Sequence, residues 1–112
     1  MLVEDDTLVA MDVCDALHNA GHGVVGPFAT VGAALHVVGA SLPDAAILDV
    51  DLGGELSFPV ADVLARGNVP FLWLSGSSPD VIPAPHRSRP FLSKPFVPTV
   101  LLTSLAQLLN IP

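Results

Sequence analysis

Four short groups of residues carry the side chains that could do chemistry. They are Glu4-Asp5-Asp6, Asp49-Val50-Asp51, Ser75-Gly76 and Lys94-Pro95. Several carboxylates held close together repel one another, and a hard divalent cation with oxygen ligands relieves that repulsion. Mg²⁺ suits such a site because it takes a few carboxylates, keeps water ligands and also binds phosphate oxygens. If the four groups meet in space, the sequence predicts a magnesium site that can handle phosphate.

The remaining side chains of these groups suit phosphoryl transfer to an aspartate. An Asp can act as a nucleophile and form an aspartyl phosphate. Lys94 carries a flexible point charge that can neutralise a carboxylate or pair with a phosphate. Ser75 offers a hydroxyl donor, and Gly76 has no side chain to block access. The catalytic work is then the positioning and neutralisation of three phosphoryl oxygens, which the cation, Lys94 and Ser75 could share.

The elements that must position these groups form a regular alternation of short apolar runs and helix-like segments. The expected strands are Leu2–Val3, 23–25, 45–48, 69–74 and Phe91–Ser93. The expected helices cover about 7–20, 30–39, 58–65 and a last segment that begins at Pro98. This alternation implies right-handed crossovers and a parallel sheet with helices on both faces. Functional groups of such sheets gather beyond the carboxyl ends of the strands, where each of the four groups lies.

Length and composition favour one folded domain. The chain has 112 residues, of which 51% are hydrophobic and only 13% charged, so it is too apolar for disorder. No apolar run approaches the ~20 residues that cross a bilayer. The first charged residues are acidic, unlike the basic start of a signal peptide, so we expect a cytoplasmic protein. Cys14 is the single cysteine, which leaves no disulfide framework.

The net charge is −7, with only four basic residues. This balance argues against direct nucleic-acid binding, which needs a basic footprint, and no segment suggests membrane binding. It fits a domain that binds a cation and docks on protein partners, although a solvated acidic surface explains most of the charge.

Four stretches at the strand ends together resemble the response-regulator receiver family of two-component signalling. They are LVEDD at residues 2–6, AILDVDL at 46–52, LWLSG at 72–76 and FLSKPF at 91–96. The resemblance covers nearly the whole chain, with the motifs in the family's order. It implies one receiver domain over residues 1–112, with a first strand cut short at Met1. The implied fold is flavodoxin-like, a doubly wound parallel sheet of five strands in the order 2-1-3-4-5.

The resemblance also implies a role for each site residue. Asp49 would be the phospho-acceptor, and Asp5 and Asp49 would ligate Mg²⁺ directly. Glu4 would act through a metal-bound water, and Asp51 would supply its backbone carbonyl. The phosphodonor would be a sensor histidine kinase or a phosphotransfer protein, and the output would be a downstream protein partner.

Ser75 would bond the phosphoryl group and act as a switch residue together with Phe91, the family's aromatic switch position. Lys94 would be the family's lysine, followed by a cis bond to Pro95. Each position also has a simpler interpretation. Asp5 and Asp6 could only favour a helix N-terminus, Ser75 could cap a turn, and Phe91 could be a core residue.

Residues 69–76 further resemble the Phe-Ala-Thr-Gly-aromatic motif of a stand-alone alphaproteobacterial subgroup. Trp73, Leu74 and Ser77 depart from that motif, whereas Gly53-Gly54-Glu55 agrees with the subgroup. Its partners include histidine kinases of the HWE type.

The segment before Lys94 is the clearest departure from the wider family. Pro79, Pro83, Pro85 and Pro90 leave a fourth helix short or missing. We expect residues 77–90 to be loosely held and to become ordered when Ser75 and Lys94 engage a phosphoryl group.

Three other functions remain open from the residues alone. A haloacid-dehalogenase-like phosphatase also has Asp-x-Asp after an apolar strand, but it needs an acidic motif after the lysine, and no acidic residue follows Asp80. A degenerate receiver would bind partners without being phosphorylated. A flavin mononucleotide binder would need a Ser/Thr-rich loop after the first strand, which is absent.

Overall fold

The centre of the molecule is a parallel sheet whose strands follow one another in chain order. The computed structural model describes residues 1–110. The sheet has the order β1-β2-β3-β4, formed by β1 (Leu2–Val3), β2 (Ala46–Leu48), β3 (Phe71–Ser75) and β4 (Phe91–Ser93). Every pairing between neighbours is parallel. The carboxyl ends of all four strands therefore lie at the same edge of the sheet, as the sequence predicts.

The expected strand at 23–25 is reduced to an extended segment beside β1. The Leu2 amide donates to the Val25 carbonyl at 2.9 Å, and the isolated parallel bridge to β1 forms three residues later, between Val3 and Phe28. Gly26 has a φ of 110°, outside the β region, and Pro27 has no amide to donate. These two residues interrupt the ladder. The segment nevertheless occupies the outer side of β1, which corresponds to the predicted order 2-1-3-4-5.

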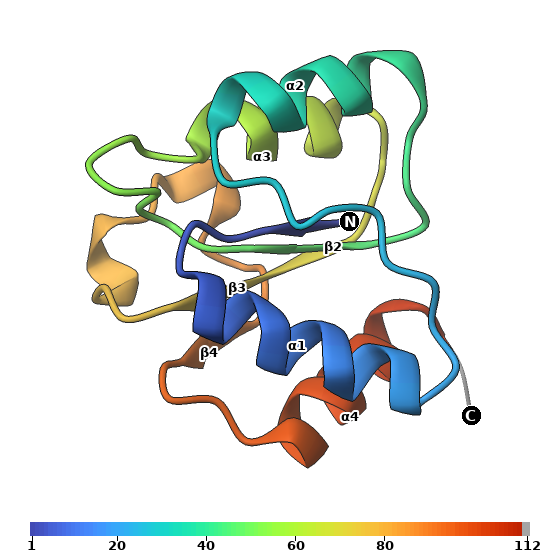
Figure 1. Ribbon diagram of the computed structural model, residues 1–112. Helices are drawn as coiled ribbons and strands as arrows, with labels where there is room; N and C mark the ends of the chain where they lie inside the picture. Colours follow the sequence, from blue (N-terminus) through green and yellow to red (C-terminus); the bar gives the residue numbers. More distant parts are fainter. Residues whose placement is uncertain (111–112) are drawn as a thin grey trace.

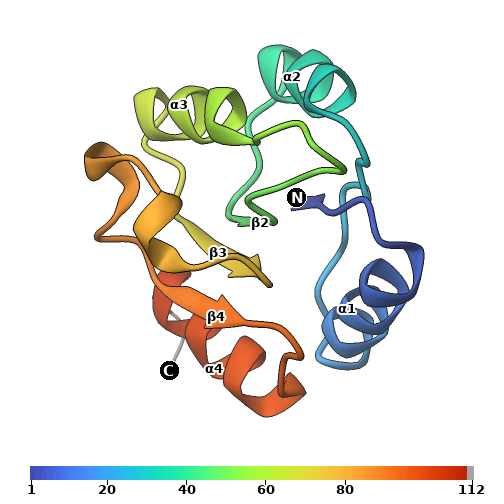
Figure 2. The same ribbon diagram turned by 90° about the vertical axis from the view of Figure 1, so that its left-hand side faces the viewer.

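Two helices cover each face of the sheet. α2 (Val31–Ala40) and α3 (Phe58–Arg66) lie on one face, and α1 (Thr7–Asn19) and α4 (Pro98–Leu108) lie on the other (Figures 1 and 2). Alternate strand residues divide between two cores, with Leu48 and Trp73 on the α2/α3 side and Ile47 and Leu72 on the α1/α4 side. Burial on both faces explains why the strands appear as continuous apolar runs.

Side chains cap the starts of two helices. The Asp6 side chain accepts hydrogen bonds from the amides of the first turn of α1, and Thr30 caps α2 in the same way. The buried face of α1 consists of Ala10, Val13 and Leu17. Leu8 and Met11, two of the apolar residues of this helix, are 74% and 57% exposed instead. Within residues 1–110, no helix combines the length and apolar character that a membrane crossing requires.

Residues 77–90 contain two short 3₁₀ helices, η1 (Pro79–Val81) and η2 (Ala84–His86), in place of a regular fourth helix. The expectation of a short or missing helix is thus confirmed. The expectation that little holds the segment is wrong. Ile82 is 2% exposed and His86 is 3% exposed.

Specific hydrogen bonds attach this segment to the body of the protein. The Trp73 indole donates to the His86 carbonyl at 3.2 Å, and the His86 ring bonds the Asp62 carboxylate of α3 at 2.6 Å. The Arg87 side chain donates to the Ile82 carbonyl at 2.8 Å. Proline removes backbone donors, but the side chains of Trp73 and Arg87 supply donors to the carbonyls in their place.

Candidate functional site

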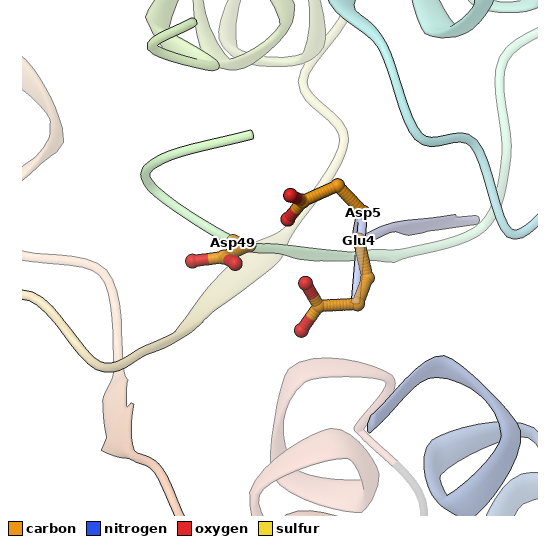
Figure 3. A group of neighbouring side chains, drawn as sticks. All are labelled: Glu4, Asp5 and Asp49. Carbon is orange, nitrogen blue, oxygen red and sulfur yellow. The ribbon is translucent and has the colours of Figure 1, made fainter. Parts of the chain in front are cut away.

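The four predicted groups meet at the carboxyl edge of the sheet. An open depression of about 340 Å³ is lined by Asp49, Asp51, Gly53, Gly54, Ser75, Gly76, Ser77 and Lys94. Glu4 and Asp5 follow β1 and place their carboxylates beside Asp49, which follows β2 (Figure 3). The structure therefore brings together every side chain that the sequence assigns to phosphate and metal chemistry. Asp6 is not part of the site, since its side chain caps α1.

Three carboxylates form the negative side of the site. One oxygen each from Glu4, Asp5 and Asp49 lies within 4.8 Å of the other two. Glu4 and Asp49 are buried, at 3% and 6% exposure, whereas Asp5 is exposed. The backbone holds them in place, because the Glu4 amide donates to the Phe28 carbonyl and the Asp49 amide to the Val3 carbonyl, both at 2.9 Å. Buried like charges at this separation favour a cation or a proton between them.

Lys94 supplies positive charge from the end of β4. Its Nζ lies 2.5 Å from Oε1 of Glu4 and 2.9 Å from Oδ2 of Asp49. The Lys94 amide donates to the Ser75 carbonyl at 3.0 Å, and the Lys94–Pro95 peptide is cis, as the resemblance implies. With all groups ionised, one ammonium does not balance three carboxylates, and negative charge remains for a second cation.

The ionisation of Glu4 and Lys94 reflects this crowding. Burial raises the pKa of Glu4 to about 7, and the adjacent Asp49 adds to this, although Lys94 opposes it. Burial tends to lower the pKa of Lys94, but its hydrogen bonds to Glu4 and Asp49 outweigh that effect and raise it. Lys94 is therefore charged at neutral pH, while Glu4 exchanges a proton in the same range. A donor set made only of carboxylate oxygens fits Mg²⁺.

Ser75 is the last residue of β3 and is 1% exposed. Its Oγ accepts a hydrogen bond from the Ser77 amide at 3.1 Å, which holds the hydroxyl at the rim of the depression. At Gly76 a Cβ atom would meet nothing within 4 Å. The depression is therefore open on this side.

The loop after Asp49 closes the remaining side of the site. Asp51 accepts a hydrogen bond from the Gly54 amide at 2.6 Å, so its carboxylate is engaged within the loop. Gly53 has a φ of 69°, and a Cβ atom there would lie 3.3 Å from Oδ2 of Asp5. Glu55 accepts from the Val31 amide at 3.0 Å and ties the loop to the start of α2. The metal-ligand role expected of the Asp51 backbone carbonyl stays a prediction.

Phe91, which was predicted to belong to the site, and Ser57, which was not, do not line the depression. Phe91 is half-buried in β4 and packs against the α2/α3 core, and its role as a switch stays a prediction. Ser57 was not predicted, yet it is fully buried and its hydroxyl donates to the Asp49 carbonyl. A Ser before a helix start is typical of a simple N-cap, so the sequence carries no signal for this contact.

Similar proteins were found among the solved structures. SdrG from Sphingomonas melonis Fr1 is 44% identical, with a TM-score of 0.84 over 96% of this chain and 92% of that chain. The PhyR response regulator receiver domain of Erythrobacter litoralis is 25% identical, with a TM-score of 0.82 over 97% of this chain and 88% of that chain. PhyR from Brucella abortus is 26% identical, and the match covers 98% of this chain but 46% of that chain, with a TM-score of 0.83.

No protein-family profile matches the chain, and no curated protein matches it. The similarity to SdrG nevertheless extends over almost the full length of both chains. The order of the motifs, the parallel sheet and the cluster at its carboxyl edge agree with this similarity. The chain belongs to the response-regulator receiver family and is of the type found among its stand-alone alphaproteobacterial members.

Proposed function

We propose that this protein accepts a phosphoryl group on Asp49, with Mg²⁺ bound beside it, in a two-component phosphorelay. The observation that carries the proposal is the contact of Lys94 with Oδ2 of Asp49 at 2.9 Å, next to the Glu4 and Asp5 carboxylates. This arrangement combines a nucleophile, a cation and a metal-binding donor set at one edge of the sheet. The relative SdrG, for which a BeF₃-activated conformation has been solved, supports the proposal because beryllofluoride mimics a phosphoryl group.

Asp5 and Asp49 would hold the metal directly, Glu4 through a water and Asp51 through its carbonyl. When bound, Mg²⁺ would supply positive charge that neutralises the phosphoryl oxygens. An Asp49 carboxylate oxygen attacks the phosphorus of a phosphohistidine, forming an O–P bond while the N–P bond breaks. The electron pair of that bond leaves with the imidazole nitrogen. Lys94 then transfers its hydrogen bond from Asp49 to a phosphoryl oxygen, and the Ser75 hydroxyl donates to another.

The phosphodonor in this proposal is a sensor histidine kinase, including those of the HWE type, or a phosphotransfer protein. The output is contact with a further protein rather than with nucleic acid, which fits the net charge of −7. PhyR from Bartonella quintana is described as an anti-anti-sigma factor, so one relative acts through protein partners. The cytoplasm, where such kinases present their phosphohistidine, remains the predicted location.

A degenerate receiver is the competing function, because the family includes domains that act without phosphorylation. The complete set of Asp49, Lys94, Ser75 and two further carboxylates favours the phospho-accepting form. The phosphatase alternative is not supported, since the similar structures are signalling domains.

Intact mass spectrometry tests the proposal. After incubation with Mg²⁺ and acetyl phosphate, we expect a gain of one phosphoryl group that hydroxylamine removes. Asp49→Asn should abolish the gain, and a chelator should do the same to the unmodified protein. Asp12→Asn is the matched control and should keep the gain, because it changes an exposed carboxylate of α1 that does not line the depression. Normal uptake by Asp49→Asn would refute the assignment.

A further inference from the structure

Ser57 occupies an unusual position at the start of α3. It is the residue before the helix, it is fully buried, and its φ and ψ are −84° and 8°. A Ser at this position ordinarily accepts a hydrogen bond from an amide of the first turn. Here no such bond forms, and the hydroxyl donates instead to the Asp49 carbonyl. The helix therefore forgoes its side-chain cap in favour of a contact with the residue proposed to accept phosphate.

Ser57 also binds the carbonyl of the residue after Asp49. The Ser57 amide donates to the Val50 carbonyl at 2.9 Å. On its other side, Asp49 donates its amide to the Val3 carbonyl at 2.9 Å. The backbone around Asp49 is thus attached to β1 through its amide and to α3 through its carbonyl. β2 itself ends at Leu48, so Ser57 holds the chain where the strand ladder no longer does.

This attachment bears on the direction of the Asp49 side chain. Its Oδ2 lies 2.9 Å from Lys94, and the carboxylate shares a small site with Glu4 and Asp5. A rotation of the peptide after Asp49 would move the carboxylate relative to both partners. Phosphoryl transfer depends on such positioning, and displacements of about 1 Å already lower rates strongly.

We propose that Ser57 is a positioning residue for the phospho-acceptor: its hydroxyl holds the Asp49 carbonyl and so directs the carboxylate toward Lys94 and the metal ligands. The inference rests on the proposed function of Asp49. It assigns to Ser57 a role in the rate of phosphorylation and in metal binding, beyond its contribution to the packing of α3.

Ser57→Ala, Ser57→Thr and Val60→Ala separate positioning from packing. Val60 is fully buried in α3, the helix that Ser57 precedes, so Val60→Ala loosens α3 without removing a hydrogen bond to Asp49. Ser57→Thr keeps the hydroxyl donor. For each variant, the phosphorylation rate with acetyl phosphate at saturating Mg²⁺ would be measured by intact mass, and the Kd for Mg²⁺ by NMR titration, at a temperature where all are folded.

For Ser57→Ala we expect a phosphorylation rate lower by about tenfold and a higher Kd for Mg²⁺, with recovery in Ser57→Thr if that variant folds. Val60→Ala should stay within about twofold of the unmodified protein despite its lower melting temperature. A normal rate in Ser57→Ala, or an equal loss in Val60→Ala, would overturn the inference while leaving the proposed function intact. Absence of phosphorylation in the unmodified protein would refute the proposed function, and this inference with it.

Discussion

Lys94 is the residue on which the electrostatics of the site depend. It contacts two buried carboxylates, Glu4 and Asp49, that lie at the ends of different strands. Its own side chain is 19% exposed, so water screens the interaction only in part. The two carboxylates would otherwise repel each other in a poorly solvated place, and Glu4 already has a pKa near 7.

Replacement of Lys94 by Met should therefore lower stability. Removing one member of a buried ion pair costs about 3–5 kcal/mol, and protonation of Glu4 and partial exposure should reduce this to about 1–3 kcal/mol. Urea unfolding at pH 7 without Mg²⁺ would measure the change. Arg66→Met, which removes an exposed charge at the end of α3, is the matched control and should be nearly neutral. An equal effect of the two substitutions would contradict the electrostatic explanation.

The raised pKa of Glu4 predicts a pH dependence of stability in the absence of metal. Its pKa is about 7 in the folded protein and 4.5 as the reference value, so the folded state binds the proton more tightly. The resulting stabilisation is fully present below pH 4.5 and is lost as the pH rises through 7. The free energy of unfolding should decrease by at most about 1.4 kcal/mol per pH unit between these values. Chemical denaturation in a chelating buffer measures it.

Glu4→Gln removes the titrating group and serves as the control for this pH dependence. The variant should lose the slope between pH 5 and 7, because no proton is then taken up at this position. Mg²⁺ favours the ionised carboxylates, so the stabilisation that it confers should be larger at pH 8 than at pH 6. The same slope in Glu4→Gln would assign the effect to other groups.

At the scale of elements, the segment between β3 and β4 is held by side chains in place of a regular helix. Ile82 enters the α2/α3 core, and His86 is enclosed between Trp73 and Asp62. Arg89 lies over the Phe71 ring at 4.3 Å from its centre. Two 3₁₀ turns and these anchors give the segment a defined path between Ser75 and Phe91, the two predicted switch positions.

Ile82→Ala should accordingly destabilise the fold as a core substitution does. We expect a loss of about 2–4 kcal/mol, because a fully buried side chain leaves a cavity. Val81→Ala is the matched control, since Val81 is 51% exposed and its truncation should change stability by less than about 0.5 kcal/mol. Thermal or urea unfolding would compare the two. Equal and small effects would mean that the segment does not pack against the core.

At the scale of the whole molecule, the site connects parts of the chain that are far apart in sequence. Lys94 and Asp49 are 45 residues apart, and Glu4 is a further 45 residues before Asp49. The carboxyl ends of β1, β2, β3 and β4 all contribute. A ligand bound at this edge therefore contacts residues that follow several strands and stabilises their arrangement together.

Binding of Mg²⁺ should stabilise the entire fold. At a concentration ten times the Kd, the free energy of unfolding should rise by about 1.4 kcal/mol. Thermal unfolding with and without Mg²⁺ would show this as a higher melting temperature. Asp5→Ala should remove the shift, and Asp12→Ala, which removes an exposed carboxylate of α1, should keep it. A melting temperature unaffected by millimolar Mg²⁺ would contradict the metal site.

The sequence by itself determined the class of fold and the members of the site. Apolar runs marked β1, β2, β3 and β4, and polar residues followed each of them. In a parallel sheet the carboxyl ends of strands share one edge, so the local pattern already brings Asp49, Ser75 and Lys94 together. The position of Asp6 at a helix N-terminus was likewise predictable, because it depends only on neighbouring residues.

Only the tertiary structure decided how the segments between the strands and helices pack. The strand expected at 23–25 does not form, and a bridge to β1 forms at Phe28 instead, since pairing with β1 depends on the geometry at Gly26 and Pro27. The segment at 77–90 is packed because Trp73 and Asp62, distant in sequence, supply partners for His86. The Ser57 hydroxyl bonds the Asp49 carbonyl instead of capping α3, which is also a contact with a different element of the fold. Periodicity and local propensity describe neighbours along the chain, whereas these contacts form between elements that only folding brings together.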